Sequence, residues 1–238
     1  MDAIKMYKFK SHEFPKEVIG EVVRMYLRYN LSLRDIAEIF LHRGIEMSHE
    51  IIRLWNLYYG HKYSSELKKR EFRRTQKYHI DEVFLTIKGQ LYYAFRAVDE
   101  EGHELETLVQ KKKDKKAAKR FFKKVLGRYE YVPGKIIVTD KLKSYPAALK
   151  EFAPHKKHIS NKSANMRAEN SHRPLRKREK GLQRFKSHRH AQMFLTAYMK
   201  IRNYFCPRQH LLSADLYRSI MVKRFDIWKE ITNQIIAA

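Results

Sequence analysis

The hydrophobic pattern of this chain changes its period at Lys77, and this change constrains the fold more than any other feature. Before Lys77, apolar residues recur at helical spacing, whereas after it they alternate with polar residues as they do along half-buried strands. Three alternating segments are expected as strands, at 77–87, 91–98 and 105–109. Because short turns separate these segments, they predict an antiparallel meander.

The order of the elements after the meander narrows the fold further. A helix is expected over 113–126, and the continuous apolar run Ile136–Val138 is typical of a strand buried on both faces. Further helices are expected over 144–152, 167–180, 191–204 and 214–235. This order predicts an α/β fold, an RNase H-like mixed sheet of three antiparallel strands plus parallel strands, flanked by helices. Element order alone also fits other mixed α/β domains.

Residues 11–61 are predicted to form an all-α helix-turn-helix module that precedes the sheet. Ser32 and Asp35 have the spacing of a capping box, and Ser48 can cap a third helix. Short trihelical units bind DNA through the last helix. His49, Glu50, Arg53 and Asn56 would lie on its outer face, and the candidate DNA contacts among them are His49, Arg53 and Asn56. A bundle that only packs against a protein partner is the alternative.

Positive charge is spread along the whole chain. Lys and Arg number 51 against 26 Asp and Glu, which gives a formal net charge of +25. We therefore expect a polyanionic partner, and nucleic acid leads because no single amphipathic helix concentrates the charge as membrane-surface binding would require. Lysine-rich solvation is the alternative. Charges interrupt every apolar run well short of the ~18 residues that a membrane-spanning helix needs.

The single cysteine, Cys206, excludes an intramolecular disulfide framework and a Cys-rich zinc site. Because the N-terminus also lacks the apolar stretch of a signal peptide, a cytoplasmic protein is expected. The predicted domain organisation is a helix-turn-helix domain at 11–62, a basic linker or extended helix at 63–76, an α/β domain at 77–205 and a helical extension at 206–238.

Two acidic residues stand at unusual places in the predicted sheet. Asp81 shares a strand face with Val83 and Leu85, where an unpaired charge would cost several kcal/mol, so it needs a basic side chain or a metal ion. Asp140 ends the buried strand, and ligands of open α/β sheets gather beyond the carboxyl ends of strands. The alternatives are an edge-strand salt bridge for Asp81 and a helix cap for Asp140.

A third acidic residue, Glu169, lies in a basic segment. His172, Arg173 and Arg176 follow it at helical spacing and would share its helix face. Pro174 complicates this arrangement, because a proline kinks or breaks a helix interior. The alternative is a surface ion pair between Glu169 and Arg173.

Three carboxylates can hold two divalent cations through the oxygen ligands that magnesium prefers. Two such ions, roughly 3.5–4 Å apart, activate an attacking oxygen and stabilise the leaving one in phosphodiester displacement, without any nucleophilic side chain. The sequence has no Walker loop, Gly-rich dinucleotide turn, Gly-x-Ser-x-Gly or His-Glu-x-x-His motif. The spacing of its histidines matches no standard zinc site.

A set of motifs, in one order along nearly the whole chain, resembles those of a known family. The motifs are Phe14-Pro15, Leu31–Asp35, Arg43–Ile45, Ile52–Trp55, His79–Phe84, Arg96–Asp99, Asp114–Phe122, Thr139–Tyr145, Arg167–Pro174 and Arg184–Ser187. In this order they are highly specific, although each alone would be weak. The chain is similar to the insertion-sequence transposases of the IS six family, which use a DDE catalytic triad.

The resemblance implies that three carboxylates are both catalytic and metal-binding. Asp81 and Asp140 would bridge or flank two magnesium ions, for which manganese would substitute, and Glu169 would hold the second ion from its helix. The implied contacts to DNA are Lys141, His158, His172, Arg173 and Arg176. His158 would contact either the DNA or the site itself.

The reaction implied by the resemblance is phosphoryl transfer on DNA. Water first nicks the end of the element and frees a 3′-hydroxyl, which then attacks a target phosphodiester and yields a cointegrate-like product. The helix-turn-helix would read the terminal inverted repeats, and a homodimer or larger synaptic assembly would bring two ends together on the nucleoid. A catalytically silent DNA-binding regulator and a hydrolytic nuclease on the same fold are the alternatives.

Overall fold

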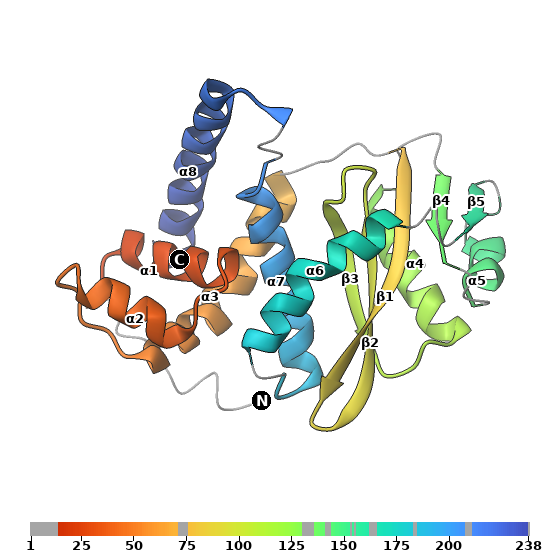
Figure 1. Cartoon of the computed structure of the whole chain (residues 1–238), viewed down its shortest axis with the longest axis horizontal. Helices are drawn as coiled ribbons and strands as arrows, with labels where there is room; N and C mark the ends of the chain where they lie inside the picture. The colour runs from red at the N-terminus through yellow and green to blue at the C-terminus, as the bar shows by residue number, and fades with distance from the viewer. Residues whose placement is uncertain are drawn as a thin grey trace.

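A computed structural model describes residues 14–70, 76–129, 136–140, 144–152, 154, 156–161, 166–182, 185–207 and 211–237. Side chains are described at these positions except 127–129, 144, 152, 166–173 and 237. The described residues form a mixed sheet with helices on both of its faces (Figure 1).

The N-terminal part of the fold is helical. Its helices are α1 (Lys16–Arg28), α2 (Leu33–Leu41) and α3 (His49–Arg70). The predicted capping box is confirmed, because Asp35 N donates to Ser32 Oγ (3.1 Å) and Ser32 N donates to Asp35 Oδ2 (2.8 Å). Ser48 Oγ accepts from Ile51 N (3.2 Å) at the start of α3. α3 continues to Arg70, so much of the basic segment expected as a linker or extended helix is helical.

The sheet has the strand order β3-β2-β1-β4-β5. Its strands are β1 (Lys77–Ile87), β2 (Gln90–Val98), β3 (Glu104–Gln110), β4 (Ile136–Thr139) and β5 (Lys157–Ser160). β1, β2 and β3 pair antiparallel, whereas β4 runs parallel to β1 and β5 parallel to β4. This is the order of an RNase H-like sheet, so the predicted fold class is confirmed. Sequence analysis missed β5, a short strand without an apolar run.

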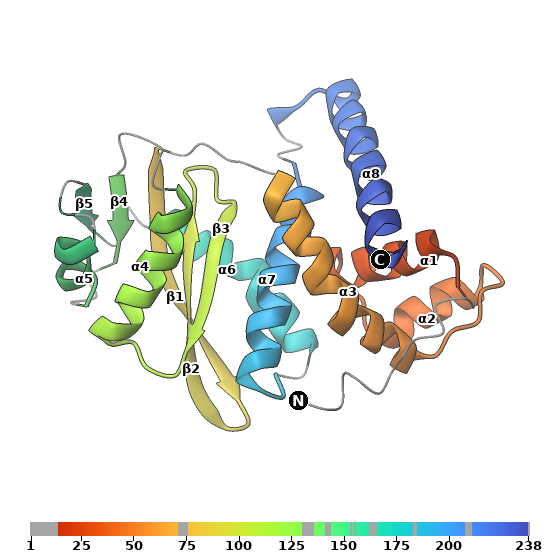
Figure 2. The same cartoon turned by 180° about the vertical axis from the view of Figure 1, so that it is seen from behind.

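Helices from different parts of the chain cover the two faces of the sheet (Figures 1 and 2). The helices are α4 (Lys115–Tyr129) and α5 (Ser144–Phe152) on one face, α6 (Met166–Gly181) and α7 (His188–Tyr204) on the other, and α8 (Ala214–Ala237), which packs on α1 and α3. All five lie within a few residues of their expected ranges. Pro174 lies inside α6 and does not end it, so the helix that carries Glu169 extends beyond the proline.

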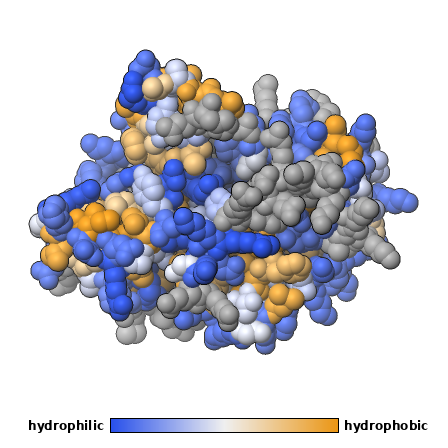
Figure 3. Space-filling view, viewed as in Figure 1, coloured by the Kyte–Doolittle hydropathy of each residue, from blue (hydrophilic) through white to orange (hydrophobic). Residues whose placement is uncertain are grey.

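Buried side chains form two clusters, one on each face of the sheet. The larger core joins Val83, Leu85 and Ile87 of β1 to α1–α3, α7 and α8. The smaller core joins Tyr78 and Ile80 of the same strand to α4 and α5. None of the described helices combines the length and the apolar character of a membrane span. Hydrophilic side chains dominate the face seen in Figure 3, with apolar ones gathered near the top over α8.

Arg178 fastens α6 to the N-terminal helices. Its buried guanidinium donates to Leu31 O and Tyr26 O (both 2.8 Å) and lies 4.3 Å from the centre of the Tyr26 ring. A buried arginine needs such partners, because an unpaired charge would be costly there. The helix that carries Glu169 is therefore fixed to the helix-turn-helix module as well as to the sheet.

Candidate active site

Carboxylates gather where β4 ends beside β1. The two strands run parallel with Thr139 opposite Ile80, so Asp140 leaves the sheet next to Asp81. One oxygen from each of Asp81, Glu82 and Asp140 lies within 4.8 Å of the others, and all three residues are half-buried. This separation would allow one divalent cation to contact all three carboxylates.

Asp81 continues the face of β1 that carries Val83, as the alternation predicts. Arg96 lies directly across from it on β2, and the Arg96 guanidinium donates to buried Glu104 (Nε to Oε2, 2.8 Å). Asp81 Oδ1 also accepts the backbone N–H of Glu82 at 2.8 Å. Arg96 therefore lies across the strands from Asp81, and the carboxylates of Glu82 and Asp140 lie beside it.

Glu82 is the candidate functional residue that sequence analysis missed. Alternation placed it on the face of Ile80, away from Asp81, but beside the end of β4 both neighbouring side chains reach Asp140. Burial raises the pKa of Glu82 to about 7; the charges of Asp140 and Asp81 add to this and Tyr145 opposes it. A carboxylate on an otherwise apolar strand face was the signal available in the sequence.

Tyr145, from α5, is fully buried beside Glu82. Burial raises the pKa of its hydroxyl, and the neighbouring charges of Glu82, Asp140 and Asp81 add to that shift. The buried Tyr145 hydroxyl and the Glu82 carboxyl interact directly, which opposes the rise in the pKa of Glu82 and adds to that of Tyr145. The carboxylate oxygens of Glu82, Asp81 and Asp140 together form a donor set that fits a hard cation such as magnesium.

Side chains from β4 and β5 hold the main chain at Asp140. The hydroxyls of Thr139 and Ser160 both donate to Asp140 O, at 2.8 and 3.0 Å. His158 Nε2 lies 2.9 Å from Thr139 Oγ1, and burial lowers the pKa of His158, which favours the neutral ring. Because the Thr139 proton is given to Asp140, the ring of His158 is the donor to Thr139. His158 therefore contacts Thr139, the residue that precedes Asp140.

Sequence matches to known proteins identify the family of this chain. A family model described as a DDE domain matches residues 75–207. The chain is 34% identical over 179 residues to the transposase for insertion sequence-like element IS431mec of Staphylococcus aureus, and equally to the transposase for insertion sequence element IS257 in transposon Tn4003 of that species. Each alignment covers 73% of this chain and 79% of the relative. The chain belongs to the IS six family of DDE transposases.

The comparison with solved structures adds nothing to this assignment. A chain of the simian T-cell lymphotropic virus intasome, in complex with PP2A regulatory subunit B56 gamma, is 13% identical over 60% of this chain and 54% of its own, with a TM-score of 0.39. That likeness is too weak to support a conclusion, so the family rests on the sequence matches.

In an IS six family transposase, Glu169 is expected to complete the triad. Glu169, His172 and Arg173 lie in α6, but their side chains are outside the described residues, and Lys141 lies outside the described chain altogether. α6 packs against β1 and β2 on the face that carries Asp81. The structure thus brings two of the expected carboxylates together, and Glu169 stays a prediction. Arg176 is exposed on α6.

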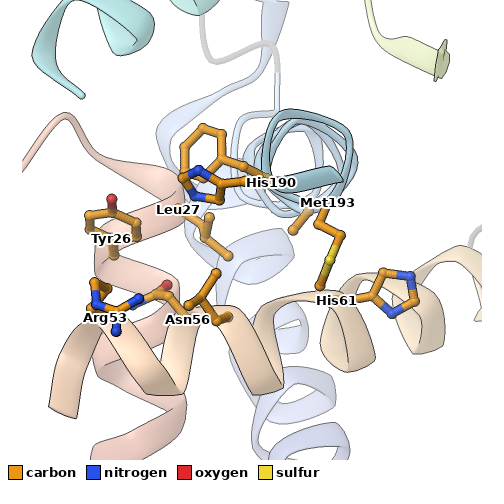
Figure 4. Close-up of a pocket in the computed structure, with 10 residues that line it drawn as sticks. Tyr26, Leu27, Arg53, Asn56, His61, His190 and Met193 are labelled. Atoms are coloured by element: carbon orange, nitrogen blue, oxygen red, sulfur yellow. The ribbon is translucent and has the colours of Figure 1, made fainter. Parts of the chain in front are cut away.

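The proposed recognition helix of this transposase exposes His49, Glu50 and Arg53 near its start. Arg53 Nε donates to Glu50 Oε2 (2.8 Å). Asn56 is half-buried and donates to a backbone carbonyl of α3 (2.9 Å), while its Oδ1 is buried without a partner among the described residues. Figure 4 shows Arg53 and Asn56 lining a pocket between α1, α3 and α7, across from His190. Asn56 therefore lies deeper than the outer face on which the sequence placed it.

A second group of metal-ligand residue types, Asp99, Glu101 and His103, lies in the turn after β2. Asp99 Oδ1 accepts the backbone N–H groups of Glu101 (2.9 Å) and His103 (2.8 Å). These bonds are the ones by which an aspartate stabilises a turn. The group is therefore accounted for by the turn that joins β2 to β3.

Proposed function

We propose that this transposase nicks the ends of its own element and joins the freed 3′-hydroxyls to target DNA. The observation that carries the proposal is the meeting of Asp81 and Asp140, with oxygens within 4.8 Å beside the end of β4, in a chain of the DDE family. Carboxylates that hold divalent ions support in-line phosphodiester displacement.

Magnesium is the proposed metal, with manganese as a substitute. Asp81 and Asp140 would hold the ions together with Glu169 from α6, and Glu82 lies close enough to add a further carboxylate. Oxygen-only donors favour hard cations of this kind. Two divalent ions in such a site activate the attacking oxygen and neutralise charge on the leaving one.

In this proposal, residues of β4 and β5 fix the direction of the Asp140 carboxylate. Thr139 and Ser160 hold its main-chain carbonyl, and His158 in turn holds Thr139. Ligands that are held rigidly before the substrate arrives need no rearrangement during the reaction. Because His158 Nε2 is engaged with Thr139, we assign His158 to positioning, with only its other ring nitrogen left to contact DNA.

The two chemical steps share one geometry at phosphorus. In the first, a water oxygen forms a bond to phosphorus as the bond to the element's 3′ oxygen breaks, which leaves a 3′-hydroxyl. In the second, that hydroxyl attacks a target phosphodiester and displaces the target's own 3′ oxygen. The residues of this chain orient both reactants, which is how a bound site converts a bimolecular step into an intramolecular one.

DNA recognition is proposed to be divided between the helix-turn-helix and the region around α6. His49, Arg53 and Asn56 of α3 would read the terminal inverted repeats. The proposed phosphate contacts are Lys141, His172, Arg173 and Arg176. Two element ends must be held at once, so we propose a homodimer or larger synaptic assembly on nucleoid DNA, with domain boundaries near residues 62, 76 and 205.

The test combines the purified full-length chain with Mg²⁺, a labelled duplex from the DNA that flanks its own gene, and a supercoiled target plasmid. We expect the label to become covalently joined to the plasmid. Joining should be lost in Glu169→Gln and kept in Asp226→Asn, which removes an exposed carboxylate from α8.

The other outcomes of this experiment would overturn the proposal in different directions. Binding of the duplex without nicking or joining would identify a DNA-binding regulator. Nicking without joining, with both element ends supplied, would identify a hydrolytic nuclease.

A further inference from the structure

A basic hollow lies between α1, α6 and α7 and shares no residue with the carboxylate cluster. It has a volume of about 370 Å³ and is lined by Arg28, Tyr29, Asn30, Lys177, Tyr198 and Arg202, together with Pro174. These residues come from the end of α1 and the turn after it, from the second half of α6, and from α7. Segments that are distant in the sequence therefore build one concave surface.

The described residues give the basic hollow no direct counter-charge. Arg28, Lys177 and Arg202 line it, no acidic residue does, and none of the three forms a salt bridge with an acid among the described residues. The charge of Glu104 interacts with that of Arg202, but Glu104 is already paired with the buried guanidinium of Arg96. Three cations held together without a counter-charge favour an anionic ligand.

The hydroxyl of Tyr198, a lining residue of the basic hollow, is influenced by the charges around it. Its hydroxyl donates to Pro174 O at 3.2 Å, which links α7 to α6. Burial raises the pKa of Tyr198, while the charges of Arg202, Arg178 and Arg28 lower it. Arg28 and Arg202, which line the hollow, therefore both act on this buried oxygen, and the charge of Glu104 opposes them.

The rim of the basic hollow is held in place and suits a nucleic-acid backbone. Arg28 Nε donates to Phe205 O (3.1 Å), and its guanidinium lies 5.1 Å from the centre of the Tyr29 ring. Tyr29 is 43% exposed, and Asn30 is exposed beside it. Arginine and lysine bind phosphate oxygens, and tyrosine and asparagine side chains add hydrogen bonds to phosphate and sugar.

The basic hollow lies between the two parts of the molecule that the proposed reaction requires. Lys177 follows Glu169 by eight positions on α6, which is roughly 12 Å along a helix axis. α6 crosses from the sheet toward the helix-turn-helix module (Figure 1), where Arg178 of α6 donates to Leu31 O and Tyr26 O. The hollow therefore joins α1, a helix of the helix-turn-helix module, to the helix that carries Glu169.

We propose that the basic hollow binds backbone phosphates of the double-stranded element end, between α1 of the helix-turn-helix module and the helix that carries Glu169. This inference rests on the proposed function, which supplies the duplex and its two contact points. The contacts are to phosphate and sugar, so they hold the register of the DNA and do not read its sequence.

The test measures binding of the labelled element-end duplex to the full-length chain by fluorescence anisotropy, in EDTA, over a series of salt concentrations. Each phosphate contact contributes about 0.9 to the slope of log affinity against log salt. One contact therefore strengthens binding about eightfold when the salt concentration falls from 1 M to 0.1 M, and a variant that loses the contact loses this gain. The double variant Lys177→Gln/Arg202→Gln should lower the slope by about 1.8 and weaken binding roughly 60-fold at 0.1 M. Lys177→Gln alone, at an exposed position, should lower it by about 0.9.

The matched control is Lys123→Gln/Lys150→Gln, which removes the same charge from exposed positions on α4 and α5, on the opposite face of the sheet. This control should leave the slope nearly unchanged. If the basic-hollow variants behaved like the control, the proposal would be wrong. If they lost binding to duplex RNA while their DNA slope stayed at the wild-type value, the hollow would be an RNA site and the proposal would again be wrong.

The joining assay separates this inference from the proposed function. A chain that binds the duplex with the expected slope changes but never joins it would overturn the proposed function alone. A chain that joins ends normally, with slopes unaffected at Lys177 and Arg202, would overturn the role of the basic hollow alone.

Discussion

The two faces of the sheet are covered by parts of the chain that differ in size and in origin. The smaller core is built between β-strands and helices of the α/β part alone, with α4 and α5 as its cover. The larger core runs from Ile19 near the N-terminus to Ile231 near the C-terminus and includes the same sheet. The helix-turn-helix is therefore packed onto the sheet through α7, and the two parts share one core.

The carboxylates lie where these two regions meet. Asp81 belongs to the face of the larger core, whereas Glu82 contacts Tyr145 of the smaller one. DNA binding should therefore depend mainly on one face and the geometry of the site on both. Changes at the junction and in each core can be compared on these two properties separately.

The largest effect is expected at the junction of the two cores, which is formed by Asp81, Glu82 and Asp140. Asp140→Asn keeps the size of the side chain and removes the charge that would hold a metal, so joining should fall by roughly a thousandfold or more. Binding of the element end, measured by anisotropy, should stay close to the wild-type value because α3 lies elsewhere. If end binding collapsed together with joining, the division between reading and cutting would be wrong.

Truncations in the two cores should cost similar free energy and act on different regions. Trp228 packs against Tyr63 and Phe205, with ring centres 5.0 and 5.5 Å away, and Phe121 packs against Phe95 at 5.8 Å. Each change to alanine should lower the free energy of unfolding by about 3–5 kcal/mol. Hydrogen exchange should show lost protection in α1–α3 and α8 for Trp228→Ala, and in α4 and α5 for Phe121→Ala. The same pattern for both variants would mean that the two faces unfold as one unit.

Much of this fold follows from local patterns in the sequence. The alternation before Ile87 and the apolar run at Ile136–Val138 predict strands because burial on one face or both faces leaves a clear periodicity. The capping box at Ser32 and Asp35 predicts the start of α2, because it uses only residues that are neighbours in the chain.

Features that depend on distant contacts were not predictable in this way. β5 is paired on β4 through its backbone, which its sequence does not reveal. Glu82 joins the site only because β4 ends beside it, and Asn56 is covered only because α7 packs on α3. Asp81, Asp140 and Glu169 stood out from their places in the predicted elements, their role as a triad came from a resemblance, and geometry now supports a common place for Asp81 and Asp140.

Glu82 gives the junction a pH dependence that neither core should share. Its pKa in the folded chain is about 7, above its ordinary value of 4.5, so the folded state disfavours the charged form. The contribution of Glu82 to the free energy of unfolding should be most favourable below pH 4.5. It should fall by up to about 3 kcal/mol as the pH rises through 7. Glu82→Gln should remove that loss. Urea unfolding at pH 5 and pH 8, in EDTA, measures the difference.

The surface variant Glu38→Gln, on α2, controls for the loss of one carboxyl. The expected result is a gain for Glu82→Gln over wild type at pH 8 that shrinks toward pH 5. Adding Mg²⁺ should also shrink the gain, because a bound cation favours the charged carboxylate. An equal difference at both pH values would contradict the assignment of this shift to Glu82.

The smallest expected effect lies in the helix-turn-helix, far from the junction. Ser32→Ala removes the acceptor for Asp35 N and should lower the free energy of unfolding by about 1 kcal/mol. Because α2 contributes Ile36 and Phe40 to the larger core, the loss should appear in global unfolding and leave joining unchanged at low temperature. Ser32→Asp, which keeps an acceptor at the N-cap, should recover most of the stability. A loss confined to α2 in hydrogen exchange, without a change in global unfolding, would show that this helix folds independently of the larger core.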